Sequence, residues 1–138
     1  MKFQSLNGQE VHCEVSQSKY PTRTKDQCKS DGQFNLGQQL KLLYKGVPIL
    51  EEFPIPGTKL SLDFFIPSFK AAFEFQGSQH DSFNKFFHAD KKDFVKQTKR
   101  DQDKKEWCKL NAIKLIEIRK PDLTFDELKA AILEIVNG

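Results

Sequence analysis

Two acidic residues stand inside the most apolar part of this chain and restrict how that part can fold. Asp63 lies in the run Leu62–Pro67, and Glu74 lies between two phenylalanines in the run Ala72–Gly77. Carboxylates rarely occur in such runs unless they are paired or bind a cation. We therefore expect two adjacent strands joined by a hairpin over residues 67–70, with the two acids close together in space.

A pair of neighbouring carboxylates favours a cation. Like charges repel, so each acid raises the pKa of the other unless a positive charge intervenes. Oxygen ligands of this kind suit Mg²⁺, Mn²⁺ or Ca²⁺. A Mg²⁺ site made of one or two carboxylates, water and phosphate is typical of enzymes that cleave phosphodiesters.

Positive charge is concentrated in one segment. Residues 84–120 contain twelve basic and six acidic residues, although the whole chain carries a net charge of only +3. A basic segment beside an acidic pocket suits a polyanionic partner such as nucleic acid. The alternative is an ordinary solvated helix face.

The remaining composition indicates one domain in a reducing compartment. A length of 138 residues fits a single domain, and the three cysteines at 13, 28 and 108 have no metal-binding spacing. No run approaches 18 apolar residues, and the N-terminus lacks the apolar core of a signal peptide. We expect a cytoplasmic protein with no membrane contact (in the host cytoplasm if the chain is phage-encoded).

Periodicity and turn residues predict a layered α/β (α+β) fold with a mixed sheet. The expected elements are a small β unit over residues 1–20, a helix over 30–46, strands over 47–54, 60–66 and 70–76, a helix over 88–110, a strand over 112–118 and a helix after Thr124. Ser30 with Gln33, and Thr124 with Glu127, have the spacing of capping boxes. The long helix has no apolar residue between Lys96 and Glu106. Its middle therefore borders either a charged site or solvent.

The order of these features resembles the PD-(D/E)XK nuclease superfamily, which has the restriction-endonuclease-like fold. Asp63, ten intervening residues, and then Glu74-Phe75-Gln76 on consecutive strands are similar to its motif, with Gln76 in the usual place of lysine. The closest likeness is to very-short-patch-repair endonucleases, related homing endonucleases and small phage nucleases. Its pieces "DF.IP", "E.DG..H" and "RD..K...C...GI.LI.I" correspond to residues 63–67, 74–80 and 100–118.

The resemblance implies a three-layer core and a set of site residues. Asp63 and Glu74 are the implied metal ligands, with the backbone carbonyl of Phe75 completing the shell. Gln76 is the implied water-positioning group, although a neutral amide supplies no charge. His80 occupies the motif histidine and is either catalytic or structural.

Further residues take supporting roles under the same resemblance. Gln33 stands where members of this superfamily carry an acid on the first helix. The metal-binding role of that acid is therefore either absent here or taken by Glu51 or Glu52. Arg100 and Lys104 lie four apart on one helix face and either meet the scissile phosphate or form an exposed charged face. The implied DNA-binding residues are Lys85, Lys92, Lys96, Lys99 and Arg100.

The expected protein is thus a single nuclease-like domain over residues 1–138, divided into a β extension (1–29), a catalytic core (30–120) and a C-terminal helix (121–138). The implied activity is Mg²⁺- or Mn²⁺-dependent cleavage or nicking of duplex, branched or nicked DNA in phage recombination, repair or homing. The alternatives are a nucleic-acid-binding module with little or no cleavage, or a subunit of a recombination or repair complex. A homodimer would be needed for paired cuts in both strands.

Overall fold

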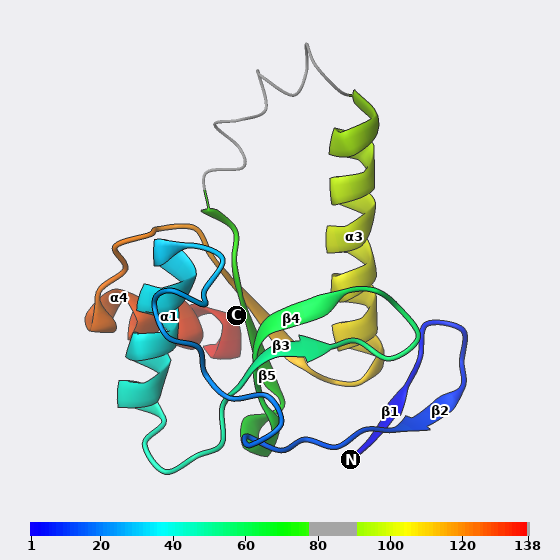
Figure 1. The fold of residues 1–138 in the computed structure, drawn as a ribbon, viewed down its shortest axis with the longest axis horizontal. Helices are drawn as coiled ribbons and strands as arrows, with labels where there is room; N and C mark the ends of the chain where they lie inside the picture. Colours follow the sequence, from blue (N-terminus) through cyan, green and yellow to red (C-terminus); the bar gives the residue numbers. More distant parts are fainter. Residues whose placement is uncertain (78–90, 138) are drawn as a thin grey trace.

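The computed structural model describes residues 1–77 and 91–137, with backbone only at 91–94, 136 and 137. Within these residues the fold is α+β, and its elements follow the predicted order (Figure 1). The helices are α1 (Asp31–Leu43), α3 (Lys91–Leu110) and α4 (Phe125–Asn137), and a short 3₁₀ turn covers Pro67–Phe69. The strands are β1 (Lys2–Gln4), β2 (Glu10–His12), β3 (Leu50–Pro54), β4 (Ser61–Ile66), β5 (Ala71–Phe75) and β6 (Lys114–Ile118).

The main sheet has the order β3-β4-β5-β6 and is mixed, as predicted. The pairs β3–β4 and β4–β5 are antiparallel, whereas β5 and β6 are parallel. Parallel neighbours need a long crossover, and α3 lies on the connection between β5 and β6. The strands β1 and β2 form a separate antiparallel hairpin.

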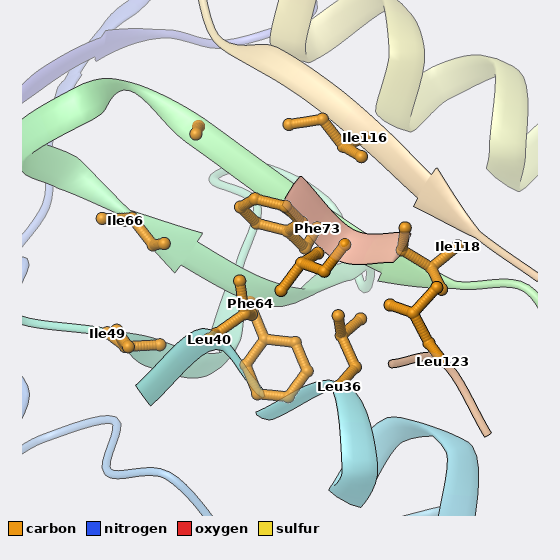
Figure 2. Close-up of a cluster of buried hydrophobic side chains, with 11 residues drawn as sticks. Leu36, Leu40, Ile49, Phe64, Ile66, Phe73, Ile116, Ile118 and Leu123 are labelled. Atoms are coloured by element: carbon orange, nitrogen blue, oxygen red, sulfur yellow. The ribbon is translucent and has the colours of Figure 1, made fainter. Parts of the chain in front are cut away.

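One hydrophobic core joins the sheet to α1 and α4. Leu36 and Leu40 of α1 meet Phe64, Phe73 and Ile118 of the sheet, as the close-up in Figure 2 shows. These residues repeat every four positions on the helix and alternate along the strands, which is the pattern that buries one face of each element.

A second core lies on the other side of the sheet, beneath the end of α3. Over residues 95–110 of α3 the buried residues are Trp107 and Cys108, which pack with Phe3 of the hairpin and Phe65 of β4. The N-terminal half of α3 extends beyond the strands in Figure 1. The sheet is therefore held between α1 and α4 on one face and the end of α3 on the other.

The strand β3 breaks its alternation at Glu52, next to the candidate site. Leu50 and Phe53 are three residues apart, yet both lie in the second core. Glu52 between them has a φ of 55°, in the left-handed region that non-glycine residues rarely occupy. The pairing register with β4 is the same on both sides of this residue, so the irregularity is a local turn of the backbone and not an insertion.

Several details differ from the sequence predictions. The strands over 47–54 and 112–118 are shorter than expected, and α1 ends at Leu43 rather than Gly46. The Thr124 capping box is complete, with both reciprocal hydrogen bonds present. The Ser30 hydroxyl accepts a hydrogen bond from the Gln33 N–H, as in a capping box. The Gln33 side chain does not return this bond and donates instead to buried Glu51. Within the described residues, the Cys28 thiol is the other side-chain donor to Glu51.

Candidate functional site

A pocket of about 730 Å³ opens where the start of α1, the strands β4 and β5, and the middle of α3 meet. Four residues of α3, at one-turn spacing, line it: Gln97, Arg100, Asp101 and Lys104. The non-apolar stretch of this helix therefore borders a charged pocket, one of the two readings left open by the sequence. The strands contribute Asp63, Glu74, Phe75 and Gln76, so the resemblance and the pocket point to the same place.

Asp63 and Glu74 replace the ladder between β4 and β5 with their own side chains. The regular pairing reaches Phe64 and Phe73, one residue short of both acids. Beyond it, the Asp63 N–H donates to Glu74 Oε2 at 2.5 Å, and the Phe75 N–H donates to Asp63 Oδ2 at 2.8 Å. Each carboxylate is thus held by the backbone of the neighbouring strand, with one oxygen left for the pocket.

Burial makes the charge on this pair costly. Asp63 and Glu74 are only 6% and 3% exposed. Burial, followed by the negative charge of Glu74, raises the pKa of Asp63 to about 7. The predicted proximity of the two acids is confirmed by the hydrogen bonds that link each carboxylate to the neighbouring strand.

Two lysines supply positive charge to the pair from opposite sides of the pocket. Lys104 Nζ lies 2.6 Å from Glu74 Oε1, and its side chain is 17% exposed. Lys29 Nζ lies 3.8 Å from Asp63 Oδ1 and 2.8 Å from Glu52 Oε1. Lys104 was expected either to meet a phosphate or to form an exposed charged face. In this structure its ammonium contacts the buried carboxylate of Glu74 and supplies that carboxylate with a counter-charge.

The two glutamates of β3 have separate partners. Glu51 is buried and accepts from the Arg23 N–H at 2.6 Å and from Gln33 Nε2 at 2.8 Å. Glu52 accepts from Ser61 Oγ at 2.7 Å and pairs with Lys29. Of the two glutamates, Glu52 is the one that shares a cation with Asp63, whereas Glu51 organises the loop before α1.

The other predicted residues are only partly gathered by the structure. Gln33, Gln76 and Arg100 line the pocket, and the Gln76 N–H donates to the Ile118 carbonyl at 2.8 Å. Lys96 and Lys99 are exposed on α3 but are not among the pocket residues. His80, Lys85 and the side chain of Lys92 lie outside the described residues.

Sequence reasoning missed Lys29, Lys59 and Ser61, which also line the pocket. Lys29 directly precedes the Ser30 cap, and Lys59 and Ser61 flank the turn between β3 and β4. The available signal was the position of Lys29 at the start of the helix on which the motif resemblance leads us to expect a site residue.

The donor set fits a Mg²⁺ site of the kind that uses two carboxylates, water and phosphate. Asp63 Oδ1 and Glu74 Oε1 each face a cation already, and their other oxygens are held by backbone N–H groups. Within the described residues, no group of three or more histidine, cysteine, aspartate or glutamate side chains is arranged to hold a metal ion.

Comparison with known proteins finds viral relatives. The chain is 38% identical over 74 residues to uncharacterized protein 033L of Invertebrate iridescent virus 3, covering 54% of this chain and 38% of that protein. It is 38% identical over 79 residues to uncharacterized protein 094L of Frog virus 3, covering 56% and 48%. Uncharacterized protein 307L of Invertebrate iridescent virus 6 is 37% identical over 59 residues, covering 43% and 30%.

The chain spans less than half the length of each of these relatives. No family model matches it, and no solved structure matches it. None of the helices in the described part of the chain is long and apolar enough to cross a membrane.

Proposed function

We propose that this chain is a metal-dependent nuclease that hydrolyses phosphodiester bonds in DNA. The observation that carries the proposal is the Asp63–Glu74 pair, two buried carboxylates that line a pocket and each turn one oxygen toward a lysine. Because the two acids are buried, their charges raise the free energy of the metal-free protein more than those of a surface pair would. Strongly perturbed acids of this kind are concentrated at functional sites.

The arrangement of elements also supports a restriction-endonuclease-like fold. A helix precedes an antiparallel three-stranded unit, and a crossover with α3 leads to a parallel fourth strand. The acids lie on the second and third strands of this unit, which is the placement that the motif resemblance implies. The viral relatives are compatible with a role in viral DNA recombination or repair, which is part of the proposal.

The chemistry assigned to the residues follows from their positions. Asp63 and Glu74 would hold Mg²⁺ or Mn²⁺, with the Phe75 carbonyl as a further donor, and the metal when bound supplies Lewis-acid polarisation of the phosphate. The Gln76 amide lines the same pocket and can orient a water by hydrogen bonds. That water adds to phosphorus as the bond to the leaving oxygen breaks, the attacking water gives up a proton to bulk water, and the leaving oxygen takes up a proton from bulk water.

Lys104 offers the positive charge that Gln76 lacks. Its ammonium lies on Glu74, from α3 rather than from the strand. A cation there can offset the negative charge that develops on the phosphate in the transition state. Arg100, one turn away in the same pocket, is placed to contact the same or a neighbouring phosphate.

The test is cleavage of supercoiled plasmid, a four-way junction and single-stranded DNA with Mg²⁺, Mn²⁺ or EDTA. We expect metal-dependent cutting that Asp63→Asn and Glu74→Gln each reduce by at least about 100-fold, the scale of groups that stabilise transition-state charge. Asp126→Asn, the same change on α4 outside the pocket, should keep full activity. Cutting that survives both pocket variants, or that is unaffected by EDTA, would refute the assignment.

A DNA-binding module without cleavage is the second candidate. It is favoured by neutral glutamines at both Gln33 and Gln76 and by the close Lys104–Glu74 ion pair, which supplies the charge balance that a metal would otherwise provide. Retained DNA binding with no cleavage of any of the three substrates would select this reading.

The product of plasmid cleavage also indicates the oligomeric state, since nicked circles fit a monomer and linear plasmid fits a symmetric dimer.

A further inference from the structure

Lys29 was not singled out by the sequence, but its ammonium occupies a central position in the pocket. It bridges two acids, at 2.8 Å from Glu52 Oε1 and 3.8 Å from Asp63 Oδ1. A lysine ammonium has three donors, and 57% of this side chain is exposed. One donor therefore remains for an acceptor that enters the pocket.

The backbone that carries Lys29 is supported by a buried carboxylate. Glu51 accepts from the Arg23 N–H at 2.6 Å, from Cys28 Sγ at 3.3 Å and from Gln33 Nε2 at 2.8 Å. These bonds connect the loop before α1 to both α1 and β3. Lys29 is consequently presented from a braced loop end and not from a free surface segment.

The residue that holds the ammonium is itself unusual. Glu52 has a φ of 55° within a strand and is fixed by Ser61 Oγ at 2.7 Å and by Gln33 Nε2 at 3.4 Å. Backbone strain of this type persists where the surroundings impose it, often at ligand sites. Burial alone would raise the pKa of Glu52, but Lys29 and Ser61 outweigh burial and lower it.

The two pocket lysines differ in how firmly they are held. Lys104 lies 2.6 Å from the carboxylate of Glu74 and is 17% exposed, whereas Lys29 is 3.8 Å from Asp63 and 57% exposed. Lys104 is thus committed to charge balance in the buried pair. Lys29 is the ammonium that can change partners without leaving a buried charge uncompensated, since Glu52 keeps Ser61 and Gln33 as donors.

We propose that Lys29 is a phosphate-binding residue of this pocket, which the ligand-free protein holds on Glu52 and Asp63. This inference rests on the proposed function, because it takes a nucleic-acid phosphate as the ligand. When a phosphate enters, an oxygen of that phosphate takes over the ammonium from Glu52, which keeps its hydrogen bonds from Ser61 and Gln33. Glu52 is a positioning residue that holds the ammonium over the pocket until the phosphate enters.

The test measures binding of a fluorescently labelled DNA duplex by anisotropy over a series of salt concentrations in EDTA. Lys29→Gln should weaken binding and reduce the slope of log Kd against log salt by about 1, the value for one lost phosphate contact. Lys29→Arg should keep the slope. Lys41→Gln, an exposed lysine in the last turn of α1, is the matched control and should match the unsubstituted chain.

The Glu52→Gln variant distinguishes a Lys29 ammonium that is available to bind phosphate from a Lys29–Glu52 ion pair that is purely structural. Release of the ammonium should tighten DNA binding by about 3–10-fold, on the scale of one modest charge interaction. The double variant with Lys29→Gln should lose that gain. An unchanged slope in Lys29→Gln, or a gain that persists in the double variant, overturns the assignment of Lys29.

Because these measurements need no cleavage, they remain informative for a chain that binds DNA without cutting it. Failure of the nuclease proposal appears as absent cutting by the unsubstituted chain. Failure of the Lys29 proposal appears as normal DNA binding with an unchanged salt slope. An unsubstituted chain that does not bind DNA overturns both.

Discussion

At the residue scale, the site consists of two buried carboxylates whose negative charge is offset by two lysines. Asp63 and Glu74 each give one oxygen to the backbone of the neighbouring strand and the other to a lysine. The hydrogen bonds from Asp63 N–H and Phe75 N–H hold the acids in place. The lysine contacts limit the electrostatic cost of having two carboxylates in the same pocket.

The raised pKa of Asp63 predicts a pH dependence of stability in the metal-free protein. Burial, followed by the charge of Glu74, raises this pKa from 3.8 to about 7. Between these values the folded state keeps a proton that the unfolded state releases, so the free energy of unfolding falls as pH rises. The fall should be on the order of a few kcal/mol and should level off above pH 7.

Urea unfolding between pH 4 and 8 checks this prediction. In Asp63→Asn the side chain cannot ionise but can still accept from Phe75 N–H, so its free energy of unfolding should lack this component of the pH dependence. Parallel pH profiles for the two proteins would contradict a raised pKa at Asp63.

At the element scale, the contact between α1 and β5 sets one wall of the pocket. Gly32 in the first turn of α1 lies against the ring of Phe75, which follows Glu74 directly. A Cβ built on Gly32 would lie 2.1 Å from Phe75 Cζ. The helix can approach the strand this closely only because position 32 has no side chain.

Gly32→Ala should therefore destabilise the protein, although alanine favours a helix by up to about 1 kcal/mol over glycine. We expect a loss of about 1–3 kcal/mol from overpacking, with loss of activity as Phe75 and the adjoining acid shift. Denaturant unfolding and plasmid cleavage measure the two effects. In a Phe75→Ala background the same change should be neutral or stabilising, and an equal cost in both backgrounds would rule out the ring contact as its cause.

At the scale of the whole molecule, the N-terminal hairpin and the end of α3 form one unit with the sheet. Phe3 lies 5.2 Å from Trp107 between ring centroids, and Asn111 exchanges two hydrogen bonds with the backbone of Gln4. Since Lys104 lies one turn before Trp107, the docking of α3 also determines where this ammonium lies.

Phe3→Ala should destabilise the protein by about 3–5 kcal/mol, the usual cost of removing a buried phenylalanine. It should also shift the emission of Trp107, the single tryptophan, to longer wavelength as water reaches the ring. Leu6→Ala, at a residue 37% exposed in the turn of the same hairpin, is the control and should change neither quantity appreciably. Normal stability and emission in Phe3→Ala would show that the hairpin does not support α3.

Local sequence determined the order of the elements and the identity of the acid pair. The alternation of apolar residues, the Ser30 and Thr124 caps and the acids in apolar strands are short-range signals, and each predicted an element or a contact that the structure contains. Only the tertiary structure decided which cations reach the acids. Lys29 and Lys104 are 34 and 30 positions from Asp63 and Glu74. The sequence singled out Lys104 as a candidate site residue but did not predict its contact with Glu74, and it did not single out Lys29. The turn of Glu52 into the left-handed region and the departure of Gln33 from its capping box have the same origin. Both features follow from buried carboxylates, which are stable only with hydrogen-bond donors and a counter-charge nearby. Which donors lie close enough depends on how the helices pack.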